Sequence, residues 1–233
     1  ISPAGKIIDY DIFESYIKSS KKMTYSKVKD ILMRDIVDPE YTPFVNTLKE
    51  MNKLAHILRK EKIARGYIDF NLSEPEIIQD ENGKAIDVVK VIREDGEKMI
   101  EDFMIAANET VASHIYNMDL PFIYRVHGEP KSEKIDDFVN LLKLLGYQLQ
   151  TRVIDLNPKT MQNILKELDD KPEFSILSSM LLRSMKKAEY SKENTGHFGL
   201  ASKAYTHFTS PIRRFPDLTV HRLLKKYLVE KDF

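Results

Sequence analysis

The spacing of hydrophobic residues predicts a chain built mainly of amphipathic helices. From Phe44 to Arg65, apolar residues recur at helical spacing and Gly66 follows directly, which favours one long helix that ends there. Similar spacing predicts several further helices. They cover residues 24–33, 96–117, 132–145, 158–169 and 173–190, and a final helix that begins at 211 or 216 and ends at 229.

Alternating apolar and polar positions predict a smaller number of strands. Residues 5–13 alternate in part, and residues 121–128 are also typical of a strand. Strand patterns at 67–72 and 76–80 precede Asn82 and Gly83, and another follows at 85–92. Asn-Gly favours the tight turn of a β-hairpin. A few strands among longer helices predict the α+β class and a single domain.

The composition limits the function classes without selecting one. The 233 residues include 36 Lys or Arg and 36 Asp or Glu, so a nucleic-acid site would have to be a local basic patch. Cysteine is absent, which excludes disulfides and thiol chemistry and agrees with a reducing cytosol. With no apolar run of about 18 residues and no secretory signal, we expect no membrane span.

The segment HFTSPIRRFPDLTVHR, residues 207–222, holds the first candidate site. Ser210-Pro211 is typical of a helix start, which would place Arg213 and Arg214 in the first turn. Cations there oppose the helix dipole, whereas the free N–H groups of that turn attract anions. A bound phosphate, which arginine binds bidentately, would explain both arginines. Salt bridges to acidic residues explain them equally well.

Aromatic and acidic residues provide further candidates with ordinary alternatives. Tyr25 and Phe70 could stack on the bases of a single strand, although an isolated aromatic is more often part of a core. Glu101 lies on a mostly apolar helix, and its neighbour Asp102 could equally be the carboxylate at the surface.

Pairs of acidic residues were considered as metal ligands, because two-metal phosphoryl chemistry needs clustered carboxylates. Each pair has an adequate structural explanation at a turn or a helix end, so none is predicted to bind metal. No glycine-rich phosphate loop, Ser-His-Asp order or HExxH motif occurs. The pairs are Asp35 with Asp38, Asp136 with Asp137, and Asp169 with Asp170.

The stretch HFGLASKAYTHFTSPIRRFPDLTVHRLLKKYL, residues 197–228, resembles the closing signature of the RNB-family exoribonucleases, and HFTSPIRR is closer to the ribonuclease R type than to ribonuclease II. Four earlier blocks resemble successive family segments in the family's order. They are residues 10–32, 63–77, 99–115 and 121–147.

The resemblance implies an RNB catalytic domain, with a mixed or antiparallel sheet packed with several helices. Residues 1–233 would form roughly its C-terminal two thirds, without the flanking OB-fold RNA-binding domains. The family holds a divalent metal, expected to be Mg²⁺, with an aspartate cluster of the pattern D-x-x-x-x-x-D-x-D-D. That pattern is not found here and is expected upstream, so no metal ligand is predicted in this chain.

The resemblance also implies roles for particular residues. Arg213 matches the catalytic arginine that contacts the scissile phosphate, and Phe70 matches the aromatic residue that clamps the 3′-terminal bases. Tyr25 and Glu101 match positions that orient the 3′ nucleotide and favour ribose over deoxyribose. Arg214 is expected near the RNA backbone.

The expected parent is therefore a processive, monomeric, cytoplasmic 3′→5′ exoribonuclease. It would bind the 3′ end of single-stranded RNA and release nucleoside 5′-monophosphates, whereas the isolated chain is expected to be inactive. Two alternatives stay open: a catalytically dead RNA-binding or regulatory module of the same fold, and a purely structural fragment of a larger domain.

Overall fold

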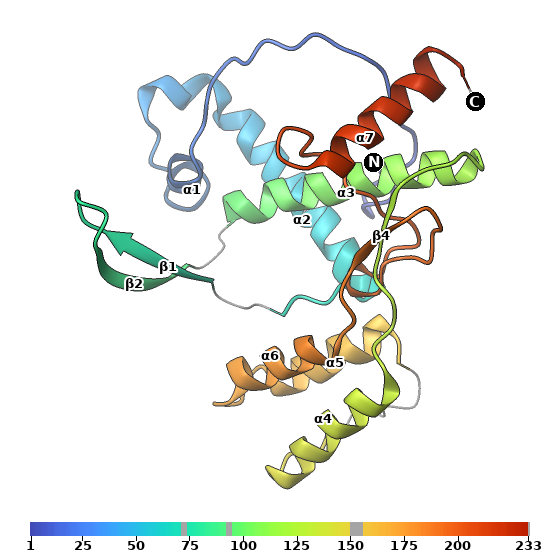
Figure 1. The fold of residues 1–233 in the computed structure, drawn as a ribbon. Coiled ribbons are helices and arrows are strands. Elements are labelled where there is room, and N and C mark those ends of the chain that lie inside the picture. Colours follow the sequence, from blue (N-terminus) through green and yellow to red (C-terminus); the bar gives the residue numbers. More distant parts are fainter. Residues whose placement is uncertain (71–73, 92–94, 150–155, 233) are drawn as a thin grey trace.

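The computed structural model describes residues 1–70, 74–91, 95–149 and 156–232, and it confirms the α+β class (Figure 1). In this part of the chain, helices predominate and there are two small antiparallel sheets, of which the β1–β2 sheet projects away from the helices in Figure 1. The helical elements are α1 (Tyr25–Arg34), η1 (Pro39–Phe44), α2 (Val45–Arg65), α3 (Asp95–Asn117), α4 (Ser132–Leu144), α5 (Pro158–Leu168), α6 (Phe174–Ser184), η2 (Phe198–Leu200), α7 (Phe215–Leu224) and the π-helical η3 (Lys225–Val229). The strands are β1 (Glu74–Gln79), β2 (Ala85–Val91), β3 (Tyr124–Val126) and β4 (Glu189–Ser191).

The long helices α2 and α3 pack against each other at the centre of the molecule (Figure 1). Leu48 and Ala55 of α2 and Met99 of α3 are buried there, together with Val28 and Ile31 of α1. Burial of these apolar side chains supplies the hydrophobic free energy that holds the three helices together.

The C-terminal half of α3 belongs to a second core, which it shares with β3 and α7. Ile115 of α3 and Val220 of α7 are fully buried, and Tyr124 of β3 packs with them. One helix therefore spans two cores, so α3 sets the relative positions of α2 on one side and of α7 on the other.

Helices α4, α5 and α6 form a third core below this centre in Figure 1. Ile68 and Phe198, from outside the three helices, are buried in it. The N–H of Ile68 also donates to the carbonyl of Gly199 at 3.0 Å. Gly66 ends α2 at φ +110°, and a side chain there would bring a Cβ atom within 3.0 Å of the Lys159 backbone nitrogen. Glycine is thus required both for the helix end and for this close approach.

The two sheets are both two-stranded and antiparallel. β1 pairs with β2 across the predicted Asn82-Gly83 turn, where Gly83 has a φ of +78°. This confirms the predicted hairpin. β3 pairs with β4, with Tyr124 opposite Ser191. In the described part of the chain, no helix is long and apolar enough to cross a membrane.

Three predicted elements are wrong in type or extent. Residues 5–13 and 67–70 form no strand, because an alternating pattern forms a strand only where a second strand pairs with it. Residues 71 and 72 of the predicted strand lie outside the described part. The helix predicted at 173–190 ends at Ser184, because Met185 takes an extended conformation, and β4 follows. Of the two starts predicted for the final helix, the one at 216 is confirmed to within one residue, since α7 begins at Phe215, and the one at 211 is not.

Candidate functional site

Helix α3 carries two polar residues, Glu101 and Asn108, that connect it to the other parts of the candidate site. Glu101 and Asn108 are seven residues apart, which is close to two helical turns, so they lie on the same face about 10 Å apart along the axis. Glu101 faces α2 and the segment after it, and Asn108 contacts the segment before α7. The two ends of this face hold two different clusters of polar residues.

Glu101 is held at its Oε1 atom by groups from two directions. The hydroxyl of Tyr67 donates to Oε1 at 3.1 Å, and Nζ of Lys62 lies 3.6 Å from the same atom. The side chain of Glu101 is 26% exposed, whereas that of Asp102 is 2% exposed. The alternative in which Asp102 is the carboxylate at the surface is therefore wrong.

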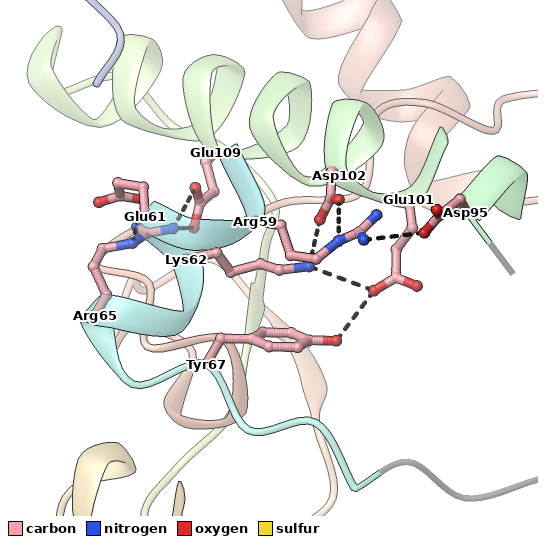
Figure 2. A network of polar contacts seen from close by, with 9 residues as sticks. All are labelled: Arg59, Glu61, Lys62, Arg65, Tyr67, Asp95, Glu101, Asp102 and Glu109. Atoms are coloured by element: carbon pink, nitrogen blue, oxygen red, sulfur yellow. Dashed lines mark hydrogen bonds and ion pairs between the residues drawn. The ribbon is translucent and has the colours of Figure 1, made fainter. Parts of the chain in front are cut away.

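Asp102 is the centre of a buried ionic network between α2 and α3 (Figure 2). Its Oδ1 lies 2.8 Å from Nζ of Lys62, and its Oδ2 accepts a hydrogen bond from Nε of Arg59 at 2.8 Å. Arg59 also lies 3.6 Å from Asp95. Arg59 and Lys62 share one face of α2 because they are three residues apart. Sequence reasoning missed this network, since it depends on which faces of the two helices meet.

Tyr25 and Phe70 pack against different parts of the fold. Tyr25 is half-exposed at the first turn of α1, and a Cβ atom on Gly96 would lie 3.5 Å from its ring, so Tyr25 sits against the start of α3. It also borders a largely apolar cavity of about 480 Å³. Phe70 packs against the core of α4–α6 and follows Tyr67 by three residues. The Tyr67–Glu101 hydrogen bond therefore ties the Phe70 segment to α3.

Arg213 and Arg214 precede α7, and the predicted helix start at Ser210-Pro211 is wrong. Arg214 is the residue before the first turn of α7, and its NH2 donates to Oδ1 of Asp217 at 2.9 Å. The same oxygen accepts from the N–H of Ser210 at 2.8 Å, and Asp217 is fully buried. An acid thus occupies the first turn, where the helix dipole favours it, and the predicted conflict of the arginines with the dipole does not arise.

Arg213 differs from its neighbour in its surroundings. Its side chain is exposed, and in the described part of the chain no acidic group forms an ion pair with it. The flanking apolar residues Ile212 and Phe215 are 102% and 72% exposed. The salt-bridge explanation considered for both arginines therefore holds for Arg214 alone, and Arg213 is presented on an exposed turn.

Three uncharged histidines, His127, His197 and His207, lie in or beside the segment that leads to this turn. Nδ1 of His127 accepts from the N–H of Gly199 at 3.0 Å, and Nδ1 of His197 accepts from the N–H of Leu200 at 3.2 Å. Burial lowers the pKa of His197 to about 3, and His127 nearby adds to the effect. Burial, followed by the charge of Arg214, lowers the pKa of His207 to about 4.

Asn108 attaches this segment to α3. Its Nδ2 donates to the hydroxyl of Tyr205 at 3.0 Å, and its Oδ1 accepts from the N–H of Phe208 at 3.0 Å. Asn108 is 2% exposed, so both bonds are shielded from water and are costly to lose. The turn with Arg213 is therefore anchored at Asn108 and at Asp217.

Among the residues that the structure describes, the side chains do not form a divalent-metal site. Across the described ranges, no three His, Asp or Glu side chains come together in a way that could hold a metal ion. Among the acidic pairs considered from sequence, Asp35 is paired with Lys49, Asp38 with Lys27, and Asp170 with Lys171.

The family model for the RNB domain matches residues 1–230, so the chain belongs to the RNB family. Within that family it is similar to ribonuclease R. It is 46% identical over 230 residues to "Ribonuclease R" of Thermotoga maritima, covering 98% of this chain but only 32% of the relative. The chain thus spans about a third of the length of the relatives that it matches.

Solved structures of ribonuclease R share this fold. The Mycoplasma genitalium enzyme in complex with ribose-methylated single-stranded RNA has a TM-score of 0.84 and 34% identity, covering 89% of this chain and 32% of that one. The same enzyme in complex with double-stranded RNA has a TM-score of 0.83 and 34% identity, covering 89% and 37% of the two chains. The resemblance inferred from sequence is confirmed.

Proposed function

We propose that the chain is part of a processive 3′→5′ exoribonuclease that hydrolyses single-stranded RNA to nucleoside 5′-monophosphates. The match of residues 1–230 to the RNB domain, together with the similarity to ribonuclease R, supports this most strongly. In this proposal residues 1–233 form the C-terminal two thirds of the catalytic domain, and OB-fold RNA-binding domains flank that domain elsewhere in a monomeric, cytoplasmic parent.

Arg213 is the proposed catalytic residue of this chain. A guanidinium that contacts the scissile phosphate stabilises the charge that develops as the phosphodiester is attacked. Its exposure supports this role, because a phosphate can approach it without breaking an ion pair within the described chain. Arg214 holds the turn through Asp217, and any contact of Arg214 with the RNA backbone is proposed as secondary.

Tyr25, Phe70 and Glu101 are the proposed binding residues for the 3′ end. Phe70 stacks on the terminal bases, and stacking tolerates any base because each has a π face. Tyr25 and Glu101 orient the last nucleotide, and the carboxylate of Glu101 accepts a hydrogen bond from the ribose. The position of Tyr25 against the start of α3, and that of Glu101 on the second turn of the same helix, support their part of this assignment.

Divalent metal would supply the activated water of the reaction, as in RNB nucleases in general, from ligands outside residues 1–233. The isolated chain is then inactive. Incubating residues 1–233 with single-stranded RNA and Mg²⁺ tests this part of the proposal, and efficient release of mononucleotides would contradict it.

The activity of the full-length protein is tested with a 5′-labelled single-stranded RNA and Mg²⁺. We expect the label to pass from the full-length RNA to a short end-fragment with few intermediates, as processive degradation requires, with nucleoside 5′-monophosphates released from the start. An RNA blocked at its 3′ end is the control and should persist. Tight RNA binding without any cleavage would instead identify a catalytically dead RNA-binding module of the same fold.

A further inference from the structure

Lys62 is a buried cation placed between two carboxylates. It is 5% exposed, and its Nζ lies 2.8 Å from Asp102 and 3.6 Å from Glu101. The same nitrogen lies 4.0 Å from the centre of the Tyr67 ring, as expected for a cation–π contact. Figure 2 shows Lys62 pointing into the space between Asp102, Glu101 and Tyr67. A lysine is seldom buried without such partners.

The need to join α2 to α3 does not by itself explain why Lys62 is present. Arg59 already donates to Asp102 at 2.8 Å from the same face of α2, so one ion pair joins the helices without Lys62. Lys62 adds a second cation on the side of Asp102 that faces Glu101. Lys62 therefore lies where it can orient the carboxylate of Glu101 in addition to joining the two helices.

Tyr67 acts on the same oxygen of Glu101. Its hydroxyl donates to Oε1 at 3.1 Å, while its ring lies under the ammonium of Lys62. The terminal torsion of a glutamate is broad when the side chain is unrestrained, so two contacts on one oxygen restrict the carboxylate considerably. Glu101 is partly exposed and can reach a ligand, whereas Asp102 is buried and cannot.

We propose that Lys62 and Tyr67 are positioning residues that fix the Glu101 carboxylate for the selection of ribose over deoxyribose at the 3′ end. This inference rests on the proposed function of Glu101. An ionised carboxylate only accepts hydrogen bonds, so it can accept from a 2′-hydroxyl and has no such partner in deoxyribose. The selectivity of that contact depends on how firmly the carboxylate is held, because a mobile group can turn to other partners.

The experiment compares two oligoribonucleotides that differ only in a 2′-deoxy sugar at the 3′-terminal nucleotides. The full-length protein and its variants are assayed for kcat/KM on both, and the ratio of the two values is the readout. Tyr67→Phe removes a single hydroxyl and keeps the ring, so it is the deciding variant. We expect it to lower the ribose-to-deoxyribose ratio by about threefold to tenfold, as the loss of one hydrogen bond would. Lys62→Met should lower the ratio in the same direction.

Matched controls separate positioning from folding. Tyr147→Phe removes another hydroxyl that donates to a glutamate, Glu173, and Lys53→Met removes an exposed lysine from the same helix as Lys62. Both should leave the ratio unchanged. A merely structural role of Tyr67 would lower the rate on both substrates equally, again without changing the ratio.

Glu101→Leu, which has no acceptor, distinguishes the inference from the function on which it rests. If Glu101→Leu lowers the ratio and Tyr67→Phe lowers it too, the inference is supported. If only Glu101→Leu does so, Glu101 reads the ribose without help from Tyr67 and the inference is overturned. If Glu101→Leu leaves the ratio unchanged, the proposed role of Glu101 fails, and the inference fails with it.

Discussion

Two polar clusters contact the same face of α3, and they are built from opposite kinds of group. The network around Asp102 contains full charges, with Arg59 and Lys62 against Asp95, Glu101 and Asp102. The second cluster contacts α3 at Asn108, seven residues after Glu101. There the segment around His197 is held largely by neutral histidines and backbone hydrogen bonds.

Because of this difference, different changes would destabilise the two clusters. In the charged network every ion depends on its partners, so removing one leaves a buried charge uncompensated. In the histidine segment the ring nitrogens accept backbone N–H bonds, so adding a proton breaks the contact. The first cluster is thus sensitive to substitution of charge and the second to acid.

The largest effect is expected for Asp102→Asn in the charged network. The change removes the carboxylate that the buried Lys62 and the partly buried Arg59 both contact. We expect the free energy of unfolding to fall by about 3–5 kcal/mol, as for other broken buried pairs. Urea unfolding of the variant and of the unchanged protein measures it. A loss below about 1 kcal/mol, the range of surface pairs, would mean that the network contributes little.

A smaller loss is expected for Asp217→Asn near the exposed arginine. The amide oxygen can still accept from the N–H of Ser210, but the charge that pairs with Arg214 is gone. Because Arg214 is 29% exposed, water replaces part of the lost contact, and we expect a loss of about 1.5–3 kcal/mol. Urea unfolding again measures it, and Asp217→Glu is a control for the charge. Equal stability of the Asp217→Asn variant and the unchanged protein would contradict the role given to this pair.

The histidine segment predicts acid sensitivity. His197 has an ordinary pKa of 6.5 when unfolded and about 3 when folded, so between these values the unfolded chain binds the extra proton. Its contribution to stability is complete above pH 6.5 and is lost progressively as the pH falls toward 3. The slope from one such histidine is at most about 1.4 kcal/mol per pH unit.

His197→Leu tests the source of this slope. The variant is less stable at neutral pH because the N–H of Leu200 loses its acceptor, but its stability should depend less steeply on pH between 6.5 and 4. Unfolding midpoints at several pH values provide the comparison. An unchanged slope would assign the acid sensitivity to other groups.

The smallest effect is expected at an exposed pair that belongs to neither cluster. Lys53 and Glu50 lie 2.7 Å apart on α2, and both side chains are 70% exposed. Glu50→Gln should change the free energy of unfolding by less than about 1 kcal/mol, since exposed ion pairs are largely compensated by water. A loss as large as that of Asp102→Asn would show that burial does not distinguish the two sites.

Local signals in the sequence predicted much of the fold. Gly66 ends α2 and Asn82-Gly83 turns the hairpin, because both require only the backbone conformations that these residues favour. The start of α7 was ambiguous, because Pro211 and Pro216 both fit the first turn of a helix. The buried contacts of Asp217 accompany the later start, and no local rule predicts them.

The residues of the candidate site also form two groups, those that the sequence could indicate and those that it could not. The roles of Tyr25, Phe70, Glu101 and Arg213 came from resemblance to a family. The pattern alone favoured core positions for Tyr25 and Phe70 and left the roles of Glu101 and Arg213 open. The roles of Lys62, Tyr67 and Asn108 could not be predicted, since each depends on contacts between residues at least 34 positions apart. Such contacts arise from helix packing and leave no periodic signal in one sequence.

The most direct test of the account is the rate of mononucleotide release by the full-length protein with Arg213→Ala. In single-turnover assays with single-stranded RNA and Mg²⁺, we expect the rate to fall by about 10²- to 10³-fold, with the Kd for RNA changed only a few-fold. Arg222→Ala, an exposed arginine of α7, is the matched control and should retain the rate. An unchanged rate with a large loss of binding would contradict the proposed contact of Arg213 with the scissile phosphate.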